Sequence, residues 1–113
     1  MSNQQIETVE LSIEQARKLV DNRTDLEKLT KNKQFKNLII ENYFEREASR
    51  LVLLKADPSM QGDVEQATIL RQIDAIGTFR QYLSTTMQRG NTAARTIADD
   101  EKTLEELRDE DMA

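Results

Sequence analysis

The stretch KQFKNLIIENYFEREASRLVLLKA, residues 33–56, decides the fold. Apolar side chains recur along it mostly at helical spacings, which is typical of a helix with a buried face. The apolar stripe is wide, so we expect this helix to be contacted from more than one side. Asp57-Pro58 ends it, because proline disfavours the α conformation of the residue before it. The stripe consists of Phe35, Leu38, Ile39, Tyr43, Ala48, Leu51, Val52 and Leu54, widened by Ile40 and Phe44.

A second helix is predicted over residues 64–89, after a short connection at 57–63. The two helices have nearly equal lengths of about 36–39 Å, which favours an antiparallel hairpin. Gly77 has two interpretations, a close helix approach or simple tolerance of glycine within a helix. Gly90 is expected to end the second helix in the left-handed conformation. The heptad-like positions of this helix are Ile69, Ile73, Ile76, Leu83 and Met87.

The N-terminal third is predicted to be less regular. Residues 1–11 show no helical periodicity and are expected to form a flexible arm, which precedes a helical domain over 12–98. Ser12 is expected to open a short helix, and Asp21-Asn22-Arg23 to interrupt it. Whether the next segment breaks near Asn32 or continues is left open. The end of the arm alternates apolar and polar residues at Val9, Leu11 and Ile13.

The composition excludes most kinds of chemistry. The 113 residues include no Cys and no His, so thiolate nucleophiles, imidazole bases and the usual zinc ligands are absent. No apolar run approaches the length of a membrane span. We therefore expect a protein that is not an enzyme and that uses no metal or cofactor.

Charge is segregated along the chain. Residues 99–113 are expected to form an acidic C-terminal helix or tail, with eight acids against two bases, whereas Lys28, Lys31, Lys33 and Lys36 form a basic cluster. Both stretches could be solvated surfaces. Alternatively, the tail of one copy could meet the lysines of another. A phosphate-binding role for the lysines, or nucleic-acid mimicry by the tail, has less support in the sequence.

Three segments resemble small all-helical proteins encoded among the structural and assembly genes of tailed bacteriophages. These segments are Glu41-Asn42-Tyr43-Phe44-Glu45-Arg46-Glu47-Ala48, Lys55-Ala56-Asp57-Pro58 and Gln72-Ile73-Asp74-Ala75-Ile76-Gly77, and the resemblance covers roughly residues 35–98. It implies a virion component or assembly factor used in many copies. It provides no catalytic residues.

Two function classes follow. The first is a bacteriophage structural or assembly protein that packs its helices against itself or a larger phage protein, in the host cytoplasm during assembly or in the virion. The second is a small phage-encoded inhibitor or adaptor that contacts a host protein through the acidic helix. The expected contact residues are Phe35, Ile39, Tyr43, Phe44, Leu51, Ile69, Ile73, Ile76, Leu83, Lys28, Lys31, Lys33, Lys36, Asp99, Asp100, Glu101, Glu105 and Glu106.

Overall fold

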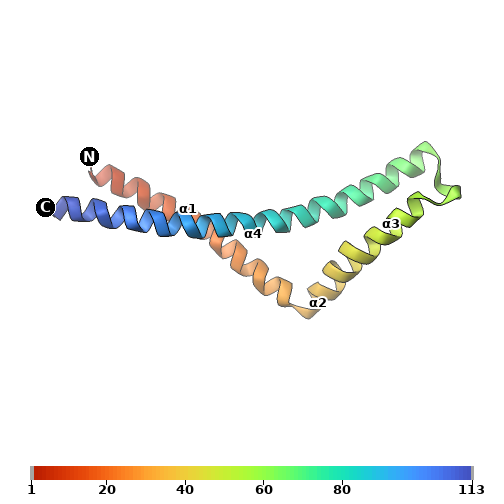
Figure 1. Ribbon diagram of the computed structural model, residues 1–113, viewed down its shortest axis with the longest axis horizontal. Coiled ribbons are helices and arrows are strands. Elements are labelled where there is room, and N and C mark those ends of the chain that lie inside the picture. The colour runs from red at the N-terminus through yellow and green to blue at the C-terminus, as the bar shows by residue number, and fades with distance from the viewer. Residues whose placement is uncertain (1, 113) are drawn as a thin grey trace. The chain divides into compact units, whose positions relative to one another are not determined.

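The computed structural model describes residues 2–112, and the prediction of an all-helical chain is confirmed over that range (Figure 1). The chain divides into two compact units. Unit 1 contains the described residues up to 26 and from 85 onward, and unit 2 contains residues 27–84. The elements are α1 (Ser2–Lys31), α2 (Lys33–Phe35), the π-helix η1 (Lys36–Glu47), α3 (Ala48–Lys55), the 3₁₀ turn η2 (Pro58–Met60) and α4 (Asp63–Met112).

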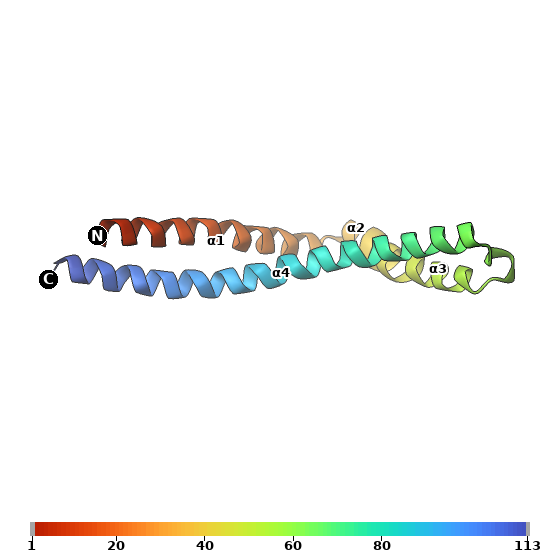
Figure 2. The same cartoon turned by 90° about the horizontal axis from the view of Figure 1, so that it is seen from above.

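Unit 1 is an antiparallel pair made by the first part of α1 and the last part of α4, which run side by side in both views (Figures 1 and 2). Its contact seam repeats at alternating spacings of three and four residues, as in a coiled coil. On each helix, this spacing keeps one narrow stripe facing the partner. The buried apolar residues of unit 1 are Ile13, Ala16 and Leu26 on α1 and Ala93 and Leu104 on α4, and the half-buried ones along the seam include Ile6, Val9, Val20, Ile97 and Leu107.

The predicted flexible arm over residues 1–11 is wrong, because helix α1 already includes Ser2 and continues unbroken to Lys31. Val9 and Ile13 lie one turn apart on the seam, whereas Leu11 between them is 53% exposed. The alternation of apolar and polar residues over 9–13 therefore arises because Val9 and Ile13 lie on one helix face and Leu11 points outward. The predicted start at residue 12 and the interruption at 21–23 are also absent from α1.

The predicted helix end at Gly90 is wrong as well. Gly90 lies inside α4, and the structure contains no positive-φ glycine in its described part. A side chain at position 90 would overlap the Cβ, Cγ and Cδ atoms of Arg23. Glycine is therefore needed here for a close helix approach rather than for a cap. One continuous helix replaces the predicted 64–89 helix and the separate acidic tail.

In unit 2, the chain turns at Asn32. This residue is extended, with φ −70° and ψ 128°, and its Oδ1 accepts a hydrogen bond of 2.9 Å from the Phe35 amide. Asparagine favours such an N-cap because its short side chain satisfies an amide at the start of a helix. The helix therefore breaks at Asn32, which answers the question that the sequence left open.

The π-helix η1 follows directly and leads into α3. π-helices have i→i+5 hydrogen bonds and occur mostly as single-turn bulges inside α-helices. The wider turn brings residues four and five positions apart onto one face, such as Ile39, Tyr43 and Phe44. This geometry accounts for the unusually wide apolar stripe in the sequence.

The predicted hairpin between residues 33–56 and the following helix is confirmed. Leu51 of α3 and Ile69 and Ile76 of α4 form the core of unit 2. At the turn, Asp57 Oδ1 accepts hydrogen bonds of 2.8 Å from the amide and the hydroxyl of Ser59. Gln66 Nε2 donates to the Lys55 carbonyl over 2.9 Å, which satisfies a free carbonyl at the end of α3.

Candidate protein-interaction surfaces

The apolar residues predicted to contact a partner lie mainly in the core of unit 2. Leu51, Ile69 and Ile76 are only 1%, 2% and 5% exposed, so they are buried against one another and not available to a partner. The assignment of these three residues as contact residues is therefore wrong. It was made because buried core residues of a hairpin recur in the sequence at the same helical spacing as residues of an interface. The other apolar residues of that set, Phe35, Ile39, Tyr43, Phe44, Ile73 and Leu83, are half-buried.

An aromatic cluster joins η1 to α4 beside this core. The ring centroids of Tyr43 and Phe44 lie 6.0 Å apart, and Phe79 lies 6.4 Å and 5.4 Å from them. All three pairs are tilted, which is a favourable arrangement for aromatic rings. The cluster fixes Phe44 at the edge of the core, next to the surface described below.

The outward face of α3 is a groove with an apolar floor. Val52 is 57% exposed and Leu53 is 74% exposed, although both belong to the most apolar helix of unit 2. Because Leu51 faces the core, these two neighbours must point elsewhere. The groove is lined by Phe44, Glu45, Ala48, Ser49, Val52 and Leu53.

A local ion pair borders this helix. Arg50 Nε donates to Glu47 Oε2 over 3.0 Å, and its Nη2 also donates to the second carboxylate oxygen. This hydrogen bonding lowers the pKa of Glu47 and raises that of Arg50. The pair joins the exposed Arg50 to the partly exposed Glu47 on one helix face, and its contribution to stability is small.

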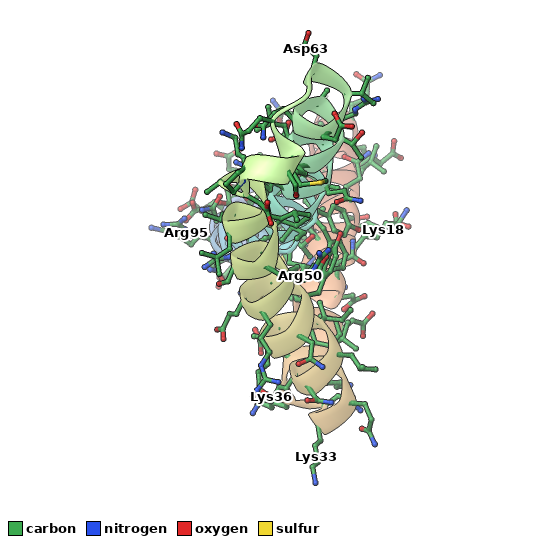
Figure 3. All side chains as sticks on the ribbon, turned by 90° about the vertical axis from the view of Figure 1, so that its right-hand side faces the viewer. Lys18, Lys33, Lys36, Arg50, Asp63 and Arg95 are labelled. Atoms are coloured by element: carbon green, nitrogen blue, oxygen red, sulfur yellow. The ribbon has the colours of Figure 1, made fainter. Side chains whose placement is uncertain are left out.

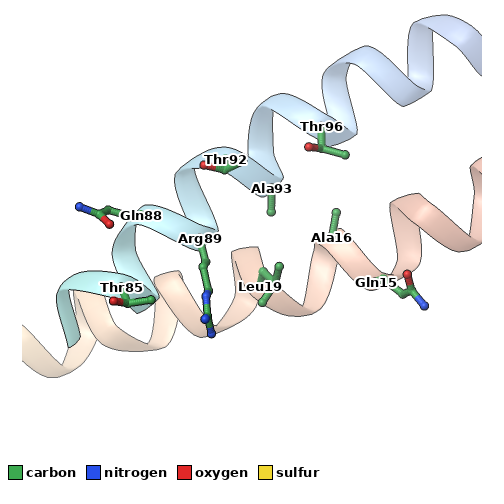
Figure 4. Close-up of a pocket in the computed structure, with 9 residues that line it drawn as sticks. All are labelled: Gln15, Ala16, Leu19, Thr85, Gln88, Arg89, Thr92, Ala93 and Thr96. Atoms are coloured by element: carbon green, nitrogen blue, oxygen red, sulfur yellow. The ribbon is translucent and has the colours of Figure 1, made fainter. Parts of the chain in front are cut away.

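Unit 1 presents a second groove, between α1 and α4 (Figure 4). Its floor is made by Ala16 and Ala93, whose small side chains point toward each other across the pair. Leu19 and three threonines of α4 line its sides. The complete lining is Gln15, Ala16, Leu19, Thr85, Gln88, Arg89, Thr92, Ala93 and Thr96.

A further hollow continues along the same pair toward the end of α4, and no ionisable side chain lines it. Gln4, Gln5, Thr8 and Val9 come from α1, and Thr103 and Leu107 come from α4. Apolar and uncharged polar residues therefore line both hollows, with Arg89 as the one ionisable lining residue.

The other side of the same helix pair carries ion pairs. Arg17 Nη2 lies 3.7 Å from Glu101 Oε1, and Arg108 Nη2 lies 3.2 Å from Glu10 Oε1. These residues flank the seam as charged positions do in coiled coils. Across the seam, Ser12 donates a hydrogen bond of 2.6 Å to Asp100 Oδ2. The predicted acidic contacts Asp100 and Glu101 therefore contact α1 of their own chain.

The remaining charged candidates are at the surface. Lys28, Lys31, Lys33 and Lys36 are exposed in unit 2, and Figure 3 shows Lys33 and Lys36 pointing away from the ribbon. Asp99, Glu105 and Glu106 are exposed on α4. A contact between the lysines of one copy and the acids of another stays a prediction.

Residues 2–112 contain no group of three or more acidic side chains placed to hold a metal ion. Within the same range, no helix is long and apolar enough to cross a bilayer. No protein-family model, curated protein or solved structure matches the chain.

Sequence reasoning missed the groove of unit 1. The available signal was the spacing of Ile6, Val9, Ile13, Ala16 and Val20, which alternates between three and four residues. That spacing predicts a coiled-coil helix over the N-terminal third, with uncharged residues on one flank.

Proposed function

We propose that this protein is a non-enzymatic structural or assembly component that acts by packing its helices against further copies of itself or a larger protein. The supporting observation is the exposed apolar face of α3, where Val52 and Leu53 lie beside small residues that permit close approach of another helix. Exposed apolar surface that lines a groove is typical of interaction sites. A bacteriophage particle is the proposed setting, on the strength of the sequence resemblance alone.

The groove on α3 is suited to a helix from another molecule. The short side chains of Ala48 and Ser49 leave the backbone accessible at its centre, so an incoming helix can approach the backbone closely. Glu45 lines one end of the groove, and exposed Lys55 lies further along α3. An antiparallel copy of the same helix would bring these opposite charges together, because each surface of a two-fold interface faces itself.

The test compares two exposed apolar positions in unit 2. Leu53→Glu places a charge in the α3 groove, whereas Val64→Glu adds the same charge at an equally exposed valine near the start of α4. We expect Leu53→Glu to lower the molar mass of the assembled protein at least twofold and Val64→Glu to leave it unchanged. Equal masses for both variants and the wild type would contradict the role of the α3 face.

A second candidate is an adaptor or inhibitor that binds a basic partner through the acidic part of α4. It is favoured by the exposure of Asp99, Glu105 and Glu106 on one helix. Such a contact would weaken steeply with salt, because exposed charges are screened within about 10 Å at 0.1 M ionic strength. A wild-type chain that stays monomeric yet binds a basic protein at low salt would favour this function over assembly.

A further inference from the structure

A stripe of four side chains follows the outward face of η1 and α3. This outer stripe consists of Glu45, Ser49, Val52 and Ala56, and all four are exposed. Their spacings of four, three and four residues keep them on one helix face, as in the contact seam of a coiled coil. The first three line the α3 groove, whereas Leu51 faces the core of unit 2. The helix therefore carries a second contact seam, which is open to solvent.

The outer stripe is complementary in size to a reversed copy of itself. In an antiparallel pair, position 45 would lie opposite position 56 of the second copy, and position 49 opposite position 52, since both pairs share a midpoint between residues 50 and 51. The short Ser49 would then meet the larger Val52, so the two side chains fill the space between the backbones. Beside the stripe, the stem of Arg46 would lie level with the 74% exposed Leu53 of the second copy and cover it.

Charge favours the same orientation. Glu45 lies at one end of the outer stripe, and exposed Lys55 lies beside its other end. In the antiparallel pair, each Glu45 would be next to Lys55 of the second copy, whereas the two glutamates would be about 16 Å apart along the helices. A parallel pair would instead place glutamate against glutamate and lysine against lysine.

We infer that the outer stripe of α3 is covered by the outer stripe of a second copy in antiparallel orientation, with a two-fold axis between residues 50 and 51. The inference rests on the proposed assembly function and specifies the partner and the register at the same groove. Unit 2 carries eight acidic and nine basic side chains, so two copies of it do not repel each other through their net charge. A face that matches itself in both size and charge about one midpoint favours a second copy over an unrelated helix.

The first test uses the absence of cysteine in the chain. Glu45→Cys and Ala56→Cys are oxidised separately and as an equimolar mixture, at a concentration where the wild type assembles. One variant carries a short tag, so mass spectrometry separates mixed dimers from like dimers. A disulfide forms only where the two Cα atoms come within about 7 Å. We expect mixed dimers in about tenfold excess over like dimers, because position 45 faces position 56 and lies about 16 Å from its own copy.

Val64→Cys provides the background from random collisions. Val64 is as exposed as Leu53 but lies near the start of α4, outside the outer stripe. Its mixture with Glu45→Cys should give no excess of mixed dimers. Like dimers in excess would indicate parallel pairing and would overturn the inference. Yields that match this background for every combination of positions 45 and 56 would overturn it as well.

The second test reverses the charges at the two ends of the outer stripe. Alone, Glu45→Lys places lysine beside lysine, and Lys55→Glu places glutamate beside glutamate. When the two variants are mixed, each lysine at 45 again meets a glutamate at 55. We expect either variant alone to raise the dissociation constant about fivefold at low salt, and the mixture to return to within about twofold of the wild type. A mixture no tighter than the single variants would contradict the antiparallel register.

The two proposals fail in different ways. If the wild type assembles and Leu53→Glu disrupts it, but positions 45 and 56 give no excess of mixed dimers, the antiparallel register is wrong and the assembly function stands. If the wild-type chain is monomeric at every concentration, both proposals are wrong.

Discussion

Arg23 of α1 and Gly90 of α4 meet face to face within unit 1. Arg23 Nη1 lies 3.4 Å from the Gly90 carbonyl oxygen and 3.0 Å from Asn91 Oδ1, and it donates a hydrogen bond to each. The arginine stem covers the place that a side chain on residue 90 would need. A glycine on one helix thus accommodates a long side chain from the other, near the end of unit 1 at residues 26 and 85.

This relationship predicts opposite effects for two glycine substitutions. Gly90→Ala should destabilise unit 1, because overpacking costs about 1–3 kcal/mol against the roughly 1 kcal/mol that alanine gains in a helix. Gly77→Ala should instead stabilise the protein by about 0.8–1 kcal/mol, since nothing lies within 4 Å of the added Cβ. Urea unfolding followed by circular dichroism measures both changes. Stabilisation by Gly90→Ala would show that the helices do not approach closely at this level.

Two leucines on α3 provide a second comparison. Leu51→Ala should lower the free energy of unfolding by about 2–5 kcal/mol, because it leaves a cavity in the core of unit 2. Leu53→Ala should change it by less than about 0.5 kcal/mol, because that side chain is 74% exposed. Denaturant unfolding of the two variants at low protein concentration measures both values. Equal losses would contradict the orientation of α3.

The turn between α3 and α4 should be sensitive to acid. Hydrogen bonds from the amide and hydroxyl of Ser59 lower the pKa of Asp57. A carboxyl with a lowered pKa stabilises the folded state above its unfolded pKa, and this contribution is lost as pH falls through the folded value. An NMR titration of the Asp57 side chain should show the lowered pKa, and Ser59→Ala should raise it part of the way. A pKa that Ser59→Ala does not move would contradict the hydroxyl contact.

The pair Glu10–Arg108 predicts a charge-swap result. Arg108→Glu should destabilise the contact between α1 and α4 by about 0.2–1 kcal/mol at low salt, since it replaces an exposed ion pair with two acids. The double variant Glu10→Arg with Arg108→Glu should restore most of that loss. Urea unfolding of the wild type and the variants at low and high salt measures these free energies. The differences in unfolding free energy between them should shrink at high salt. Failure of the double variant to recover would argue against the observed helix register.

Local signals made part of the fold predictable. The helix over residues 33–56 and its stop at Asp57-Pro58 follow from short-range periodicity and proline chemistry, and α3 ends in the structure at Lys55. The hairpin with α4 followed because the two segments are similar in length and joined by a short connection. These features depend on neighbours in the sequence.

Features that depend on a partner helix were not predictable in the same way. Val9, Leu11 and Ile13 fit an extended arm as well as a helix until α4 supplies a surface for Ile13 to pack on. Gly90 is equally suited to a helix cap and to a close approach, and only the presence of Arg23 opposite decides between them.

The candidate surfaces show the same limitation. An apolar stripe in sequence does not distinguish a core position from a contact position, so Leu51 was expected at an interface although it is buried within the chain. The two outward neighbours, Val52 and Leu53, became candidates only once the direction of the core was known. The groove of unit 1 required the pairing of α1 with α4, because the spacing of apolar residues on α1 indicates a helix seam but does not say which segment packs on it.

The molar mass of the full wild-type chain, measured by light scattering on a sizing column at low and high salt, tests assembly most directly. We expect a defined multimer that persists at high salt, because the α3 groove is an apolar contact without dominant ion pairs. A fall in mass with salt would instead point to a contact of Lys28, Lys31, Lys33 and Lys36 with the acidic end of α4. A monomer at both salts and at all accessible concentrations would contradict assembly of the chain.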